Sequence, residues 1–150
     1  MMLTIKPAHK DDAAAISQIL REMDLYYPSK VPENFWVAKE NNNIIGVACL
    51  TEYDDFLFLS SVGVIEEHQR KGIAKALLEK ILHDLKKDVY LYTVIPRFFK
   101  KFGFEIVTRK DPTIPENLPS KESLGCENCL SADCTRMVKR NSTCNKKQGC

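Results

Sequence analysis

The stretch over residues 56–85 changes its hydrophobic period in the middle, and this change constrains the fold more than any other feature. Its first part, up to Val64, is a nearly continuous apolar run of the kind found in buried strands. From Ile73 onward the apolar residues recur every three or four positions, as on one face of an amphipathic helix. The members of this helical stripe are Ile73, Ala74, Leu77, Leu78, Ile81, Leu82 and Leu85. The sequence therefore predicts a strand, a tight turn and a helix in direct succession.

The turn contains Gln69-x-x-Gly72-x-Ala74, which puts two small residues at the start of the helix. Small side chains leave the first helical turn bare. Its free N–H groups and the positive end of the helix dipole can then bind phosphate oxygens. An ordinary strand–helix joint packed around a glycine is an equally good interpretation, because a lone glycine motif is weak. The motif by itself leaves diphosphate binding and simple packing open.

The rest of the chain predicts short strands and two more helices. One helix should be capped by Asp11 or Asp12, and another should cover residues 96–102, beginning at Pro96 and ending at Gly103. The apolar face of the first comprises Ala15, Ile16, Ile19, Leu20 and Met23. Strands are expected at residues 3–7, 35–38, 44–50, 56–64, 88–93, 104–107 and 137–139. This order predicts an α/β or α+β fold in which helices flank a central, mixed and mostly antiparallel sheet.

Two segments, in this order, resemble the GNAT family of N-acetyltransferases. Gln69-x-x-Gly72-x-Ala74, behind a valine-rich strand, is similar to the family's acetyl-CoA signature, and the segment that ends in Gly103-Phe104 is similar to its late helix. The resemblance covers roughly residues 2–110. It implies a GNAT-like fold, acyltransferase chemistry with acetyl-CoA as cosubstrate, and a GNAT core over residues 1–110. Residues 111–150 would form a proline-containing loop and a cysteine-rich extension, packed on the same domain or trailing it.

The resemblance also implies how acetyl-CoA is held. Backbone N–H groups over residues 69–74 would bind the diphosphate, and the strand edge over residues 62–64 would pair with the pantetheine arm. The N–H of Val62 would point at the developing oxyanion. Arg70 and Lys71 either add charge near the phosphates or face solvent. The expected cofactor-binding residues are Val62, Gly63, Val64, Gln69, Arg70, Lys71, Gly72, Ile73, Ala74, Lys75 and Phe99.

Proton transfer is where this sequence departs from the family pattern. Many members carry a late-helix tyrosine that protonates the leaving thiolate, and Phe99 takes its place here. Because the pKa of a free thiol is about 8.5, acid assistance is helpful rather than essential. Tyr92, or Tyr90 on the same predicted strand, is the expected substitute. The candidates for a general base are Glu52, Asp54, Asp55 and His68, with a water chain as an equal alternative.

The acceptor is indicated by Arg97-Phe98-Phe99 ahead of the Gly-Phe pair. This pattern resembles the acetyltransferase module of N-acetylglutamate synthase-like proteins. It implies transfer to a primary amine, with the α-amine of glutamate or another small amino acid to be considered first. Arg97 forms a basic helix face with Lys100 and Lys101 that suits a carboxylate, although most such faces are simply solvated.

Other interpretations of the acceptor site stay open. Tyr26 and Tyr27 follow the first helix and either wall the acceptor pocket or pack against a core edge. The acceptor can also be a peptide or a polyamine. Phe99 and the absence of an obvious base favour a different class of protein, namely a regulatory or sensor module that binds CoA without turnover.

Five of the six cysteines fall in the last 25 residues. Cys126, Cys129 and Cys134, with Cys144 or Cys150 as a fourth ligand, form a candidate zinc site. The spacing is loose for zinc, so a reduced cluster or a reversible disulfide is the simpler alternative. A metal-binding interaction module at the C-terminus is a third interpretation of the chain.

Length and composition are those of an ordinary globular domain. The chain has 150 residues, a net charge of +2, 44% hydrophobic and 28% charged residues. The small charge gives no argument for nucleic-acid or membrane partners. No apolar run has the length of a membrane span, and the N-terminus lacks a signal-peptide pattern. We therefore expect a cytoplasmic protein that acts on a small-molecule amine, with a homodimer as a further possibility.

Overall fold

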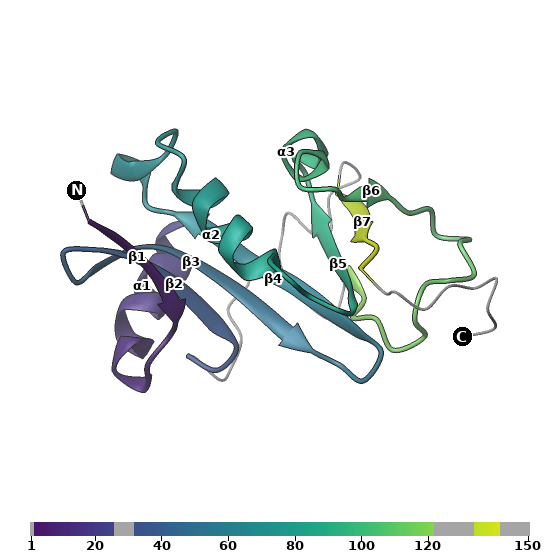
Figure 1. Ribbon diagram of the computed structural model, residues 1–150, viewed down its shortest axis with the longest axis horizontal. Helices are drawn as coiled ribbons and strands as arrows, with labels where there is room; N and C mark the ends of the chain where they lie inside the picture. The colour runs from purple at the N-terminus through teal and green to yellow at the C-terminus, as the bar shows by residue number, and fades with distance from the viewer. Residues whose placement is uncertain (1, 26–31, 122–133, 142–150) are drawn as a thin grey trace. The chain divides into compact units, whose positions relative to one another are not determined.

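The structure of the chain, a computed structural model, describes residues 2–25, 32–121 and 134–141. Its elements are β1 (Leu3–Pro7), α1 (Ala13–Glu22), β2 (Phe35–Glu40), β3 (Asn43–Glu52), β4 (Phe56–Val64), α2 (Ile73–Leu82), β5 (Asp88–Thr93), α3 (Pro96–Lys100), β6 (Glu105–Ile106) and β7 (Thr135–Lys139) (Figure 1). Two 3-10 helices, η1 (Lys10–Asp12) and η2 (Glu66–His68), precede α1 and α2. None of the helices in the described part of the chain has the length and apolar character needed to span a bilayer.

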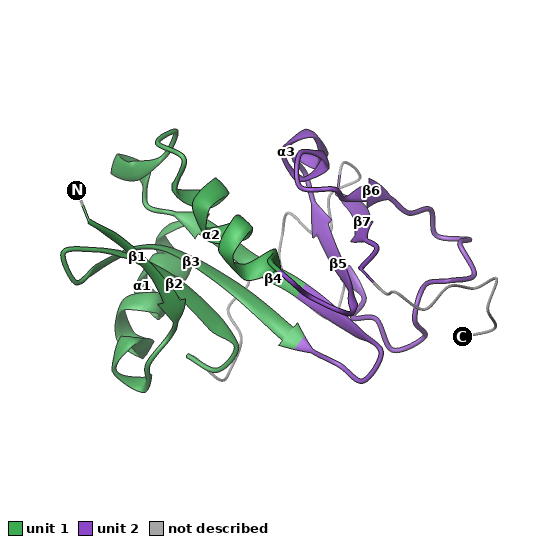
Figure 2. Ribbon diagram, in the orientation of Figure 1, with its two compact units in different colours: residues 1–51, 59–83 green, residues 52–58, 84–150 purple. Residues whose placement is uncertain are grey.

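The strands form a seven-stranded sheet in the order β1-β2-β3-β4-β5-β7-β6. Antiparallel pairing joins β1 to β2, β2 to β3, β5 to β7 and β6 to β7, whereas β4 and β5 pair in parallel. The prediction of a mixed, mostly antiparallel sheet with helices is therefore confirmed. The chain divides into two compact units: residues 1–51 with 59–83, and residues 52–58 with 84–150 (Figure 2). The predicted division at residue 110 stays a prediction.

In the first unit, α1 packs its apolar face on the inner residues of β2 and β3. The buried residues of this core are Ile16, Ile19, Leu20, Phe35, Val37, Val47 and Cys49. Ala15 was expected on the buried face but is exposed. Asp12 occupies the N-cap position of α1, but its side chain makes no capping bond there. Instead, its carboxylate accepts from the backbone N–H of His9 and from Lys39 Nζ, at 2.8 and 3.0 Å.

Helix α2 carries the predicted stripe, with Ile73, Leu77, Leu78, Ile81 and Leu82 buried. Leu85 was expected on the same face but follows the end of the helix, which stops at Leu82. At the first turn, Ile73 packs against β3: a Cβ built on Gly46 would lie 3.3 Å from Ile73 Cγ2. The start of α2 is therefore fixed to the sheet by its first buried side chain.

In the second unit, the loop after β6 covers one face of β5 and β7. Ile114 and Leu118 of this loop pack on a core made of Phe56, Phe58, Tyr90, Val107 and Val138. Strand β7 extends the predicted 137–139 to five residues and lies between β5 and β6. The segment over residues 111–120 contributes no strand.

Two predicted boundaries near α3 are wrong. The helix begins at Pro96 as expected but ends at Lys100 rather than Phe102. The N–H groups of Phe102 and Gly103 donate three residues back, to the carbonyls of Phe99 and Lys100, and Gly103 has a left-handed φ of +92°, so the α-helical pattern ends early. Lys139 Nζ donates to the Phe102 carbonyl at 2.7 Å. The following strand covers Glu105–Ile106, which pair with Val138 and Met137 of β7, and just after it the Val107 N–H donates to the Arg136 carbonyl at 3.0 Å.

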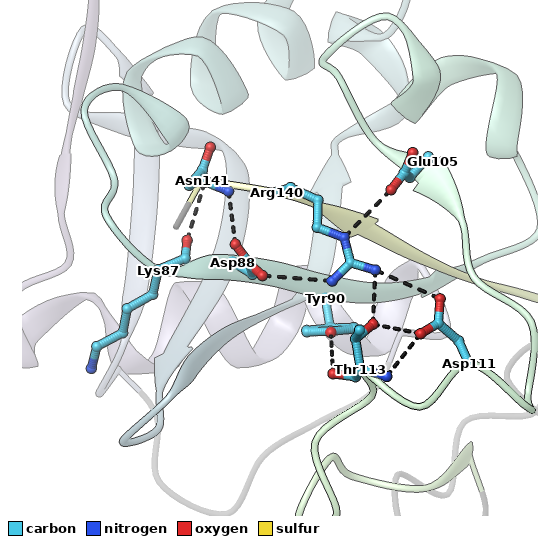
Figure 3. A network of polar contacts seen from close by, with 8 residues as sticks. All are labelled: Lys87, Asp88, Tyr90, Glu105, Asp111, Thr113, Arg140 and Asn141. Carbon is cyan, nitrogen blue, oxygen red and sulfur yellow. Dashed lines mark hydrogen bonds and ion pairs between the residues drawn. The ribbon is translucent and has the colours of Figure 1, made fainter. Parts of the chain in front are cut away.

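A polar network centred on Arg140 holds the end of β7 to its neighbours (Figure 3). The guanidinium lies 3.7 Å from the Asp88 carboxylate, 3.4 Å from that of Glu105 and 3.7 Å from that of Asp111. It also donates to Thr113 Oγ1 at 3.0 Å, and the adjacent Asn141 N–H donates to Asp88 at 2.8 Å. One cation thus meets three acids from separate elements, which makes this cluster structural in character.

Candidate functional site

The end of β4 departs from regular strand geometry at Ser61, which is buried and has a φ of +55°. A left-handed residue inside a strand turns the following peptide away from the ladder direction. The next residue is Val62, whose N–H is the predicted oxyanion donor. Val62 is half-buried, whereas Gly63 and Val64 are buried. Ser61 was not predicted, because nothing in Leu59-Ser60-Ser61-Val62 marks an irregular position.

Gly63 is a position of close approach. A Cβ built on this glycine would lie 2.7 Å from Leu25 Cδ1 and 2.9 Å from Met23 Sδ. The end of α1 therefore reaches the backbone of β4 at a point where a side chain would collide. Packing alone therefore explains a glycine at this position.

The connection from β4 to α2 is tied back to the strand that it leaves. The side-chain amide of Gln69 donates to the Val64 carbonyl at 2.9 Å, and the Ile65 N–H donates to the Ile45 carbonyl at 2.9 Å. Arg70 then takes a left-handed φ of +65°. These contacts fix the path of the predicted phosphate-binding loop within the first unit.

Gly72 is the N-cap of α2 and has a φ of +80°, a conformation that residues with a Cβ rarely adopt. Its own position supplies no side-chain cap for the helix, and a Cβ built there would meet no atom within 4 Å. Arg70, Lys71 and Lys75 are exposed around it. An uncapped helix N-terminus that faces open space and basic side chains fits a diphosphate. Ile73 is buried and Ala74 half-buried, so any ligand contact of Ile73 would come from its backbone.

The predicted acid candidates lie in the second unit and already make hydrogen bonds. Tyr92 Oη donates to the Pro119 carbonyl at 2.6 Å, and Tyr90 Oη donates to the Thr113 carbonyl at 3.2 Å. Phe99 is buried in α3, with its ring against those of Phe98 and Phe104. Burial raises the pKa of Tyr90.

The basic face of α3 is exposed. Arg97, Lys100 and Lys101 all lie at the surface, and no ion pair joins any of them to another described residue. They are therefore accessible to an anionic ligand, as a carboxylate-binding role requires.

The candidate bases lie in different surroundings. His68 Nε2 is 3.3 Å from Glu40 Oε1, while His68 Nδ1 and Glu40 Oε2 are buried and have no hydrogen-bond partner among the described residues. Glu52 pairs with Lys87 at 2.9 Å. Asp54 and Asp55 are exposed in the turn before β4. Of these four candidates, His68 is the one whose side chain lies beside a carboxylate among the described residues, that of Glu40.

Several predicted residues lie outside the described part of the chain, namely Tyr26, Tyr27, Cys126, Cys129, Cys144 and Cys150. Of the proposed zinc ligands only Cys134 is described. It is buried, and its carbonyl accepts from Lys121 Nζ at 2.6 Å. The described ranges contain no group of three His, Cys, Asp or Glu side chains arranged to hold a metal ion. The zinc prediction is therefore untested.

The chain is similar in sequence to known acetyltransferases. The model of the acetyltransferase (GNAT) family matches residues 7–104. An uncharacterised N-acetyltransferase of Chlorobaculum tepidum is 30% identical over 114 residues, which cover 71% of this chain and 70% of the relative.

Solved structures share the fold. N-acetylglutamate synthase from Neisseria gonorrhoeae, complexed with coenzyme A and N-acetyl-glutamate, superposes with a TM-score of 0.70 at 16% identity, covering 94% of this chain. The chain spans only 35% of that synthase. An acetyltransferase of the GNAT family from Staphylococcus aureus superposes with a TM-score of 0.68 at 19% identity, covering 93% of this chain and 99% of the relative. The predicted fold is thus confirmed. The chain belongs to the acetyltransferase (GNAT) family and is a GNAT N-acetyltransferase.

Proposed function

We propose that this enzyme transfers the acetyl group of acetyl-CoA to the α-amine of a small acidic amino acid, with L-glutamate as the first acceptor to test. The open N-terminus of α2 at Gly72 is the observation that carries the acetyl-CoA half of the proposal. The acceptor half is supported by the Arg97-Phe98-Phe99 pattern. It is also supported by the shared fold with a synthase that was solved with coenzyme A and N-acetyl-glutamate.

In the proposed site, backbone groups hold acetyl-CoA. The N–H groups at the start of α2 would bind the diphosphate, and Arg70, Lys71 and Lys75 would add positive charge at the surface. The strand edge of Val62, Gly63 and Val64 would pair with the amides of the pantetheine arm. The Val62 N–H, directly after the left-handed Ser61, would donate to the carbonyl oxygen as negative charge develops there.

The transfer makes one bond and breaks one. The amine nitrogen bonds to the acetyl carbon, the carbon–sulfur bond breaks, and the sulfur leaves as a thiolate. The amine loses one proton and the thiolate gains one. The site therefore has to move one proton from the amine to the sulfur. Tyr92 is our candidate for the acid. Because a free α-amine is mostly protonated at about pH 7 and only its neutral form attacks, the rate should rise as the pH is raised from about 7 toward about 8.

The assay is the release of CoA in the presence of acetyl-CoA and a panel of amines. Glutamate and aspartate should be turned over in preference to lysine, polyamines and peptide N-termini. Turnover of those other amines with none for glutamate or aspartate would contradict the acceptor assignment but leave the N-acetyltransferase class intact.

A CoA-binding module without turnover is the second candidate. The hydroxyls of Tyr90 and Tyr92 already donate to backbone carbonyls, and Phe99 offers no proton. The same panel decides this question. Tight binding of CoA without release from acetyl-CoA, for any amine tested, would favour the module over the enzyme.

A further inference from the structure

Arg136 of β7 has a hydrogen-bonding edge that the described structure leaves unused. It pairs across the sheet with Tyr92 of β5, and its guanidinium carbon lies 5.5 Å from the centre of the Tyr92 ring. The ring thus backs the planar guanidinium and restricts its orientation. Arg136 Nε is buried and has no hydrogen-bond acceptor among the described residues. A buried charged donor without an acceptor is unfavourable until a ligand or a water molecule supplies one.

A second cation lies over the same ring. Lys121 Nζ is 5.9 Å from the Tyr92 centroid, and it donates to the Cys134 carbonyl at 2.6 Å. That bond uses one of three ammonium protons. The position of Tyr92 is fixed by its hydroxyl bond to Pro119 and by Phe58, whose ring centre is 5.8 Å away. Two positive groups are therefore held on one side chain by contacts within the second unit.

Neither cation is neutralised by a described acid. No ion pair joins Arg136 or Lys121 to a carboxylate of the described residues. Arg140, four residues further along the same chain segment, is the contrast, because it meets Asp88, Glu105 and Asp111. The charge of Arg140 is thus balanced by carboxylates of the same chain. Arg136 and Lys121 are each half-buried, and no described acid offsets their positive charges.

We propose that Arg136 and Lys121 bind a carboxylate of the acceptor, with the Nε edge of Arg136 as the main donor and Lys121 as the second. The guanidinium edge matches the two oxygens of a carboxylate, and desolvation strengthens the pairing. The choice of ligand rests on the proposed acetylation of an acidic amino acid. Such an acceptor has two carboxylates. We assign the side-chain carboxylate to this pair and leave Arg97 as the candidate for the α-carboxylate.

The first experiment compares kcat/KM for glutamate and for glutamine, which differ only in the side-chain carboxylate. Arg136→Gln and Lys121→Gln should each lower kcat/KM for glutamate by about tenfold or more, with little change for glutamine and for the KM of acetyl-CoA. Arg136→Lys keeps the charge but loses the planar edge, so its kcat/KM for glutamate should lie between those of the wild type and Arg136→Gln. Arg109→Gln, which removes an exposed arginine from a turn of the same unit, is the matched control.

The second experiment does not depend on turnover. The complex of the enzyme with CoA is titrated calorimetrically with glutarate, a dicarboxylate that has no amine. Wild type and Arg109→Gln should bind glutarate, and Arg136→Gln and Lys121→Gln should bind it about tenfold more weakly or worse.

The outcomes separate this inference from the proposed function. A wild type that does not bind glutarate overturns the carboxylate site, whichever amines it acetylates. Equal losses for glutamate and glutamine in folded Arg136 and Lys121 variants also overturn it, because they show a structural role. If glutarate binds as expected but no amine is acetylated, the carboxylate site stands and the proposed acetylation of acidic amino acids fails.

Discussion

The side-chain amide of Gln69 donates to the backbone carbonyl of Val64 at 2.9 Å, and so joins the start of the proposed diphosphate loop to the end of β4. Both residues flank η2, and the bond closes this connection onto the strand. Gln69, the first residue of the motif, can therefore favour CoA binding by fixing the path of the loop, without contacting CoA itself. On this interpretation Gln69 is a positioning residue.

Gln69→Ala should weaken CoA binding by about tenfold, or about 1.4 kcal/mol, because the loop loses its tie to Val64. Gln69→Glu should act similarly, since a carboxylate cannot donate to a carbonyl. Calorimetric titration with CoA measures both, with Glu67→Ala in η2 as the exposed control. CoA affinity that is unchanged in both Gln69 variants would remove the positioning role.

Gly72→Glu should abolish detectable CoA binding, whereas Gly72→Gln should only weaken it. Both side chains have similar bulk, and both are strained at a φ of +80°, by about 1–2 kcal/mol. They differ in charge, and a carboxylate about 4 Å from a phosphate is unfavourable by roughly 1–4 kcal/mol. We expect the two Kd values to differ by about fivefold to several hundredfold, measured by calorimetry on variants whose circular dichroism is that of wild type. Equal affinities would place the phosphates elsewhere.

The elements that the sequence predicted best are those whose signal is local. The apolar run before Val64 and the stripe beginning at Ile73 placed β4 and the start of α2 at the observed residues, and β5 likewise matches its prediction. Burial period is a property of neighbouring residues, so it can be read without knowing what the chain packs against. The GNAT motif lies at this same well-predicted joint.

The features that prediction missed depend on distant partners. The Phe102 carbonyl, just after α3, accepts from Lys139 of β7, a contact between residues 37 positions apart. The left-handed Ser61 has no glycine or asparagine to mark it. The pairing of β7 with β5 places Arg136 beside Tyr92, which the sequence pattern does not indicate. Pairings across many residues of sequence leave no local pattern, which explains why the second unit was predicted less completely than the first.

Arg97→Ala should raise the KM for glutamate by about tenfold, roughly 1.4 kcal/mol for one lost charge-assisted contact, and leave CoA binding nearly unchanged. If Arg97 binds the α-carboxylate, the KM for glutamine should rise by the same factor, in contrast to the Arg136 variants. Steady-state kinetics with both amino acids distinguishes the two sites, and Lys80→Ala on the exposed side of α2 is a control for loss of one positive charge. Wild-type kinetics for Arg97→Ala would exclude it from the acceptor site.

The carboxylate of Asp12 gives a prediction about pH. Burial opposes its charged form, but the His9 N–H and the Lys39 ammonium favour it, and the net result is a pKa below the usual value. A lowered folded-state pKa stabilises the fold at pH values above the unfolded-state pKa of about 3.9, and this contribution is lost as pH falls through the folded-state pKa.

Asp12→Asn should therefore lower the free energy of unfolding at pH 7 by about 2 kcal/mol, because it weakens hydrogen bonds to a charged group that is only 10% exposed. The same loss should appear at pH 5, since the wild-type carboxylate is still ionised there in both states. Below about pH 4 the wild type should lose stability faster than the variant, so that the two converge. Urea unfolding at pH 7, 5 and 3 measures this difference. The neighbouring Asp11→Asn, whose side chain is 82% exposed, should change stability by at most about 0.5 kcal/mol at each pH. A gap between wild type and Asp12→Asn that stays constant down to pH 3 would show that Asp12 stabilises the fold through packing and not through its charge.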